Sequence, residues 1–184
     1  MVTFSSRVAD AIDSKNSLLC VGLDPDVQRI PAHLHAHPDT IYRFCHEIIA
    51  ATHDLVAAFK PNIAFFEALG AGGVEILARV MELSPSSLWI LDAKRGDIGN
   101  TAAAYATAAF DYLKADAITL NPYLGGDSLE PFWRAQNAAR FCFAAPQIQA
   151  APTCKNSSSP TVGRSIWPSP SSPNSIGTAT ATSA

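Results

Sequence analysis

Charged residues of alternating sign gather in the stretch WILDAKRGDIGNTAAAY, residues 89–105, where an apolar run meets an alanine-rich segment. Asp92, Lys94 and Asp97 place a carboxylate, an ammonium and a second carboxylate in this turn, and Lys60 closes another apolar run. Residues two apart in a strand point to the same face, so we expect Asp92 and Lys94 to lie side by side. Such an array is electrostatically preorganised, because each charge has an opposite neighbour.

Three consecutive apolar runs end in an ionisable group. Asp24 follows the first in VGLDPD, Lys60 the second, and Asp92 with Lys94 the third. The carboxyl ends of parallel strands are where βα-barrels carry out their chemistry. For DAKRGD alone, a purely structural ion pair explains the sequence equally well. Three strand ends together favour a functional site.

Elements that would position these residues alternate along the first 140 residues. Continuous apolar runs predict strands at 17–23, 55–60, 87–94 and 116–122, each covered on both faces. Asp39 can cap a helix that starts beside it, and Ser128 one that runs to Trp133, with further helices at 74–81 and 101–113. Repeated β-α units indicate an α/β fold with a parallel sheet.

Composition narrows the functional class. The chain has 184 residues, enough for one domain, with 48% hydrophobic and 16% charged residues and a net charge of −3. It offers no basic stripe for nucleic acid or a membrane surface, so a small-molecule partner is favoured. Charges among the first 30 residues interrupt any signal-peptide core, and we expect a cytoplasmic protein. The cysteines form no C-x-x-C pair, so we expect free thiols.

Two other patterns have weaker functional interpretations. His33, His35 and His37 alternate in HLHAH, which is compatible with a metal clip, but prolines bracket the segment and favour a solvated loop. Phe65 and Phe66 could stack on a base, although aromatic residues beside a strand end more often belong to the core. Neither pattern is assigned a site, and no metal site is expected.

Four motifs carry a family resemblance. In order, LCVGLDPD, FKPNIAFFEALGAGG, ILDAKRGDIGNTAAAYA and ADAITLNPYLGGDSLEPF resemble orotidine 5'-phosphate decarboxylase, in its longer bacterial branch, over about residues 4–134. The resemblance implies a (β/α)8 TIM barrel of which residues 1–140 hold about the first four β/α units. It also implies a carboxy-lyase of de novo pyrimidine biosynthesis that converts orotidine 5'-monophosphate to uridine 5'-monophosphate and CO2 without a cofactor.

The resemblance also implies roles for individual residues. Lys94 would stabilise the carbanion that develops at C6 and then protonate it. Asp92 would stand against the departing carboxylate, and Lys60 and Asp97 would complete the charged array. The family's homodimer would bring Asp97, Ile98 and Thr101 into the neighbouring subunit's site, with Asp24 and Lys60 on the ribose hydroxyls. The alternative within the superfamily is a sugar-phosphate lyase that uses Mg²⁺ at the acidic positions.

The pattern changes after about Arg140. Residues 141–184 are rich in Ser, Pro, Thr and Ala, and the last acidic residue of the chain is Glu130. Such a composition predicts disorder. Codons permitted for residues 144–156 can also be read in a second frame, which starts at the third base of the Ala144 codon. This reading gives RTSNPGSADLQE, which is similar to a stretch that the family has after its fifth strand.

We therefore hypothesise a frameshift near residues 139–143. The family holds the substrate phosphate with later barrel loops, and such remote binding energy keeps a substrate against charges it would otherwise avoid. We expect the chain as written to be an inactive fragment of the decarboxylase.

Overall fold

The structure, a computed structural model, describes residues 4–134 and 139–142. A parallel sheet of five strands in the order β1-β2-β3-β4-β5 organises this part of the chain. Its strands are β1 (Cys20–Leu23), β2 (Ala58–Pro61), β3 (Leu88–Arg95), β4 (Ala117–Leu120) and β5 (Ala139–Cys142). Each strand is hydrogen-bonded to the next in sequence, so the carboxyl ends share one edge.

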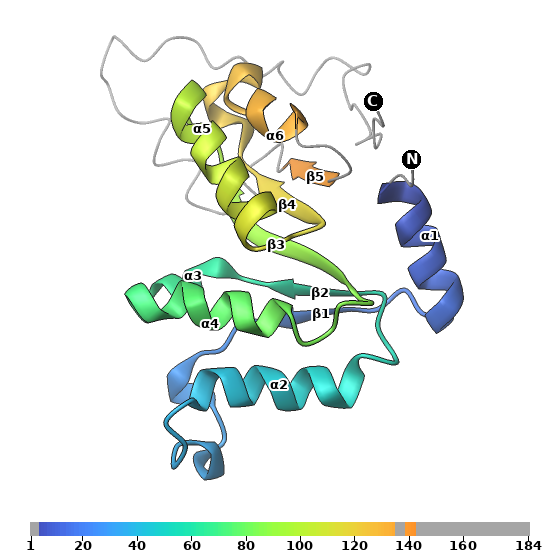
Figure 1. The fold of residues 1–184 in the computed structure, drawn as a ribbon, viewed down its shortest axis with the longest axis vertical. Coiled ribbons are helices and arrows are strands. Elements are labelled where there is room, and N and C mark those ends of the chain that lie inside the picture. The colour runs from blue at the N-terminus through green and yellow to red at the C-terminus, as the bar shows by residue number, and fades with distance from the viewer. Residues whose placement is uncertain (1–3, 135–138, 143–184) are drawn as a thin grey trace, which may run out of the picture.

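One helix precedes the first strand, and the others connect successive strands, as the β-α alternation predicts. They are α1 (Phe4–Lys15), α2 (Thr40–Thr52), α3 (Ile63–Glu67), α4 (Ala71–Met81), α5 (Gly99–Ala106), which continues as a π-helical segment (Thr107–Tyr112), and α6 (Glu130–Arg134). Short 3₁₀ turns occur at Val27–Arg29, Ala32–Leu34, Pro122–Leu124 and Gly126–Ser128. Helices α2 and α4 lie side by side along β1 and β2, while α5 and α6 lie together near β3, β4 and β5 (Figure 1).

The core lies between the sheet and these helices. One face of α2 buries Ile41, Cys45 and Ile49, which recur every four residues and therefore share a helix face. Phe59 of β2 stacks on Trp89 of β3, with ring centroids 5.2 Å apart. Burying such large side chains stabilises the fold by about 1.5–3 kcal/mol each.

Two helix starts differ from the sequence-based expectation. Asp39 precedes α2 but makes no capping hydrogen bond; its carboxylate pairs with Arg79 of α4 at 3.5 Å. Ser128 was expected to cap the helix of residues 128–133, but its hydroxyl donates to the Gly125 carbonyl and α6 begins at Glu130. In both cases the polar side chain interacts with a group outside the helix instead of capping the helix.

The sheet also extends beyond the expected end of the pattern. The sequence predicted four strands and a boundary at residue 140, whereas β5 spans Ala139–Cys142 and pairs with β4. Its residues form a short stretch that sequence periodicity alone does not separate from the tail. The disorder and the altered reading frame expected for the tail concern residues 143–184, which lie outside the described residues.

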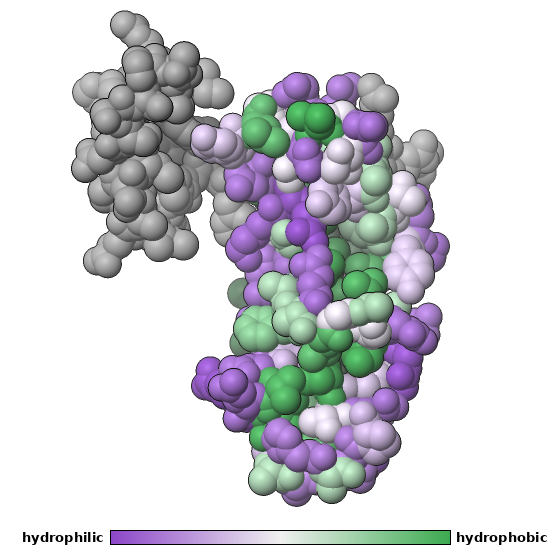
Figure 2. Space-filling view, turned by 90° about the vertical axis from the view of Figure 1, so that its left-hand side faces the viewer, coloured by the Kyte–Doolittle hydropathy of each residue, from purple (hydrophilic) through white to green (hydrophobic). Residues whose placement is uncertain are grey.

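The described residues contain no helix long and apolar enough to cross a membrane. Figure 2 views the molecule from the side on which α3 lies, and hydrophobic residues gather in the middle of the lower half of this face, between polar flanks.

Candidate active site at the strand ends

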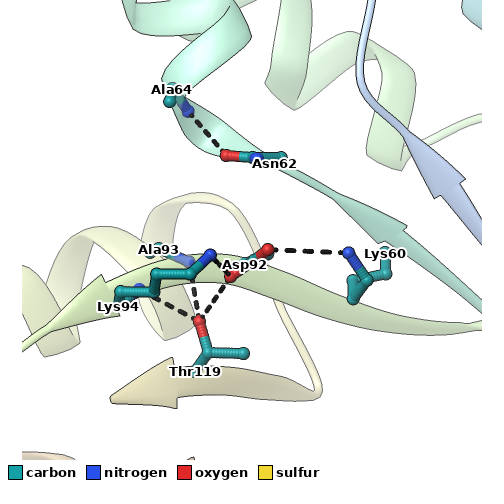
Figure 3. Close-up of polar contacts among 7 residues, drawn as sticks. All are labelled: Lys60, Asn62, Ala64, Asp92, Ala93, Lys94 and Thr119. Atoms are coloured by element: carbon teal, nitrogen blue, oxygen red, sulfur yellow. Dashed lines mark hydrogen bonds and ion pairs between the residues drawn. The ribbon is translucent and has the colours of Figure 1, made fainter. Parts of the chain in front are cut away.

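Asp92 is the centre of a charged cluster at the carboxyl end of β3. Its Oδ1 accepts hydrogen bonds from Lys94 Nζ at 2.6 Å and from Thr119 Oγ1 at 2.8 Å. Its Oδ2 lies 3.5 Å from Nζ of Lys60, at the end of β2. The three side chains and Thr119 converge from β2, β3 and β4 (Figure 3). The cluster therefore unites three of the residues that the sequence singled out with one that it did not.

Burial differs sharply within the cluster. The Asp92 side chain is 11% exposed, while those of Lys60 and Lys94 are 37% and 54% exposed. Burial by itself raises the pKa of Asp92, but the hydrogen bonds from Lys94 and Thr119 and the charges of both lysines outweigh it, so the pKa of this carboxyl lies below its ordinary value. The site thus holds an ionised carboxylate between two ammonium groups.

A bulge in β3 brings Lys94 onto Asp92. The register between β3 and β4 shifts between Leu91 and Arg95, and Lys94 has a left-handed backbone with φ of 49°. Regular strand alternation, the basis of the sequence prediction, is therefore not the reason that the two side chains meet. Bulges re-aim side chains near the ends of strands and are common beside active sites.

Close backbone packing fixes the turn after β3. A Cβ added to Gly96 would lie 2.2 Å from the carbonyl oxygen of Asn121, and the Asn121 N–H donates to the Arg95 carbonyl at 2.8 Å. The Arg95 guanidinium pairs with Glu67 of α3 and lies over the Tyr105 ring of α5, 4.8 Å from its centroid. The turn is thereby tied to both neighbouring helices.

Other predicted site residues lie at the rim. Asp24 is exposed at the end of β1, and Ile98, which is 68% exposed, precedes α5. Asp97 accepts a hydrogen bond from the Ile98 N–H at 2.7 Å. Thr101 lies in the first turn of α5 and is half-buried. Within the described chain, none of these four contacts the Asp92 carboxylate.

The weaker candidates take structural places. His33, His35 and His37 are exposed, and His35 Nε2 shares a hydrogen bond with the Ile30 carbonyl at 2.9 Å. The residues that the structure describes hold no group of three or more His, Cys, Asp or Glu arranged for a metal ion. Phe66 is fully buried in the core, as expected for an aromatic residue beside a strand end.

The sequence interpretation missed Thr119 and Asn62, whereas it places Asn121 after the fourth strand, facing the mouth, without assigning it a role. Thr119 is the one hydroxyl in the buried run AITL, an oddity that could have marked it. Asn62 and Asn121 follow β2 and β4, and each side-chain oxygen accepts an N–H two residues further on, from Ala64 and Tyr123. Such turns are typical of asparagine at strand ends.

Comparisons with known proteins agree on one family. A family model described as Orotidine 5'-phosphate decarboxylase / HUMPS family matches residues 17–151. A protein of Roseiflexus sp. (strain RS-1) named orotidine 5'-phosphate decarboxylase is 56% identical over 142 residues, which cover 77% of this chain and 52% of that protein. One of the same name from Aromatoleum aromaticum is 53% identical over 131 residues, covering 70% of this chain and 48% of that protein.

Solved structures give the same result. The OMP decarboxylase of Leishmania donovani superimposes with a TM-score of 0.70 and 41% identity, covering 82% of this chain and 57% of that chain. The UMP synthase of the same organism gives a TM-score of 0.69 and 41% identity, covering 82% of this chain and 32% of that chain. These relatives are TIM barrels, so the expected fold class is confirmed: the sheet is the N-terminal part of such a barrel. The chain spans about half the length of the curated relatives it matches.

Proposed function

The chain belongs to the orotidine 5'-phosphate decarboxylase / HUMPS family, and we propose that it supplies the charged half of an active site that converts orotidine 5'-monophosphate to uridine 5'-monophosphate and CO2. The observation that carries this proposal is the Lys94 ammonium held 2.6 Å from the buried carboxylate of Asp92, with Lys60 on its other oxygen. Decarboxylation leaves an electron pair on carbon, and a fixed cation beside that carbon is the group that stabilises it.

The reaction assigns a separate task to each charge. When the bond between C6 and the carboxylate breaks, CO2 leaves and the electron pair stays on C6. Lys94 stabilises this carbanion electrostatically and then donates a proton from Nζ to C6. Asp92 stands against the substrate carboxylate, and their repulsion is relieved as CO2 departs. Lys60 keeps Asp92 oriented through Oδ2, on the side away from Lys94.

The remaining residues are assigned to binding and assembly. Asp24 and Lys60 contact the ribose hydroxyls. Asp97, Ile98 and Thr101 complete the site of a second subunit, in a two-fold homodimer that works in the cytoplasm. The exposure of Ile98 supports this assignment, since its side chain is accessible to a partner and the half-buried Asp97 is its direct neighbour in the chain.

A Mg²⁺-dependent sugar-phosphate lyase of the same superfamily is the second candidate, because the description of the matching family names a second group beside the decarboxylase. In that reaction a cation would bind the acidic residues of the mouth. Here both oxygens of Asp92 already face ammonium groups, at 2.6 and 3.5 Å. A metal ion would have to displace a lysine, so the geometry favours the decarboxylase.

A decarboxylation assay tests the proposal. The 184-residue chain and a version with the reading frame restored after residue 143 are incubated with orotidine 5'-monophosphate, and released CO2 and uridine 5'-monophosphate are measured. We expect turnover by the restored form and none by the short chain. Lys94→Ala should lower turnover of the restored form by at least about 10³-fold, because a preorganised charge is lost from the reacting carbon.

Controls separate the candidates. Exposed Lys114→Ala should leave turnover unchanged, and a chelator should have no effect on the decarboxylase. Loss of activity on chelation would instead favour the lyase. A restored form that releases no CO2 contradicts the decarboxylase proposal, whereas turnover by the short chain that disappears with Lys94→Ala contradicts its expected inactivity.

A further inference from the structure

The Thr119 hydroxyl is the hub of the hydrogen bonds beneath the charged cluster. Thr119 is 4% exposed, in the strand β4 whose other residues are apolar. Its Oγ1 donates to Asp92 Oδ1 at 2.8 Å and accepts the N–H groups of Ala93 at 2.9 Å and Lys94 at 3.0 Å. A hydroxyl has one proton and two lone pairs, so its whole capacity is used within three consecutive residues of β3.

These hydrogen bonds act where β3 departs from regular pairing. The bulge between Leu91 and Arg95 takes backbone N–H groups out of the ladder, and Thr119 accepts two of them. Lys94 has the left-handed φ of 49°, a conformation that is unfavourable for a side-chain-bearing residue unless its surroundings fix it. Without the hydroxyl, the N–H groups of Ala93 and Lys94 would lose their acceptor, and the bulge would lose its support.

We propose that Thr119 is a positioning residue of this site: its hydroxyl locks the Asp92 carboxylate and the Lys94 backbone into one rigid arrangement that aims Lys94 Nζ. Thr119 touches no reacting atom in this scheme and acts through its two neighbours. The catalytic consequence rests on the proposed decarboxylase function, while the structural coupling does not.

The low pKa of Asp92 supports this role. The hydrogen bond from Thr119 is one of the contributions that keep the pKa of Asp92 below its ordinary value against the effect of burial. The same hydroxyl hydrogen therefore orients the carboxylate and favours its ionised form beside Lys94. A hydroxyl that served only to fill β4 would have no such effect on a neighbouring strand.

The first experiment needs no turnover. In the 184-residue chain, carbon-13 NMR follows the pH titration of the Asp92 carboxyl and the Cε resonance of Lys94, the latter assigned by its loss in Lys94→Ala. Thr119→Val keeps the shape and removes the hydroxyl, and it should raise the pKa of Asp92 and shift the Lys94 resonance. Thr119→Ser keeps the hydroxyl and should restore both values to near those of the unmodified chain.

A matched control removes a buried hydroxyl elsewhere. Ser87 is buried just before β3, and its Oγ shares a 2.7 Å hydrogen bond with Ser84 Oγ. Ser87→Ala should leave the titration of Asp92 unchanged even if it lowers stability. Should Thr119→Val fold poorly, Thr119→Cys offers a weaker hydrogen-bonding group of similar size, and an intermediate pKa of Asp92 is expected. An Asp92 titration that is the same in Val, Cys and Ser variants overturns the proposal.

The second experiment measures catalysis in the frame-restored form. Thr119→Val should lower kcat by about 10²-fold with KM changed by less than about threefold, because misplacement of catalytic groups affects the transition state more than substrate binding. Thr119→Ser should recover most of kcat. A fall in kcat/KM that comes from KM alone contradicts a positioning role. If no form turns over, the proposed function fails, and the NMR result still decides the role of Thr119.

Discussion

Replacing Asp92 by asparagine should destabilise the fold in a pH-dependent way. Asparagine keeps the shape and can still accept the hydrogen bond of Thr119, so the main loss is the negative charge between Lys60 and Lys94. At the observed distances of 3.5 and 2.6 Å, the attractions are worth about 1.2 and 1.6 kcal/mol in a water-like dielectric. That dielectric is appropriate because the lysines are 37% and 54% exposed.

Two effects reduce this sum. Exposed ion pairs rarely contribute more than about 1 kcal/mol each. Burying the charged carboxylate of Asp92 also costs free energy, and the uncharged asparagine side chain does not incur that cost. We therefore expect Asp92→Asn to lower the free energy of unfolding by about 1–2 kcal/mol at pH 7. Urea denaturation followed by circular dichroism measures this difference, and an unchanged m-value would show that the folded and unfolded states keep their compactness.

The pH dependence has a definite sign. The folded-state pKa of Asp92 lies below its ordinary value, so folding is favoured when this carboxyl is ionised. Its contribution is complete above the unfolded-state pKa of about 3.9 and is lost as the pH falls through the folded-state pKa. The stability gap between the unmodified chain and Asp92→Asn should be constant from pH 5 to pH 7 and should narrow below about pH 4.

A control and a salt series complete the test. Asp54→Asn makes the same charge change at an exposed position, and its effect should stay within about 0.5 kcal/mol. Raising the salt concentration to 0.5 M should shrink the Asp92→Asn gap, since salt screens exposed lysines. A variant as stable as the unmodified chain at pH 7, or a gap that does not change between pH 5 and pH 3, would refute the electrostatic account.

Two further predictions concern packing. Gly73→Ala should lower the free energy of unfolding by at least about 2 kcal/mol, because the new Cβ would lie 1.8 Å from the Phe66 carbonyl oxygen. Gly72→Ala, whose new Cβ would have nothing within 4 Å, should be neutral or stabilising by up to about 1 kcal/mol. Urea denaturation measures both variants, and equal effects would contradict the close packing of α3 on α4. Burial raises the pKa of the Cys45 thiol to about 12. A disulfide reagent at pH 8 should therefore modify exposed Cys20 at least about tenfold faster than Cys45 in the native chain. Equal rates for the two thiols, measured at denaturant concentrations below the unfolding transition, would be inconsistent with a buried Cys45.

The apolar runs predicted the parallel sheet because strands covered on both faces need continuous hydrophobic sequence. The runs at 55–60 and 87–94 became β2 and β3 within a few residues. The grouping of Lys60, Asp92 and Lys94 followed from the same rule, since the ends of parallel strands share one edge. Neighbouring elements in sequence are neighbours in this sheet, and for that reason local pattern carried most of the topology.

The features of the site that the sequence did not predict depend on contacts between residues that are far apart in the chain. At the bulge beside Lys94, the backbone N–H groups of Ala93 and Lys94 donate to Thr119, which lies on another strand. Gly96 must be glycine because the Asn121 carbonyl occupies the place of its Cβ. Each of these residues has an ordinary local interpretation as a strand or turn residue. Only the register between β3 and β4 joins them into one site.

The charge balance of the cluster connects the described chain with its proposed assembly. Lys60 and Lys94 bring two positive charges to the single carboxylate of Asp92, so the cluster has an excess of one positive charge. An approaching anion is attracted by this net positive charge. The substrate carboxylate can balance it before decarboxylation and the carbanion during it, and Asp97 of a second subunit can do so throughout. Under the proposed function, the charged cluster of one chain thus binds negative charge. The carboxylate of the partner subunit's Asp97 would neutralise part of the cluster's positive charge, and the substrate would neutralise the rest.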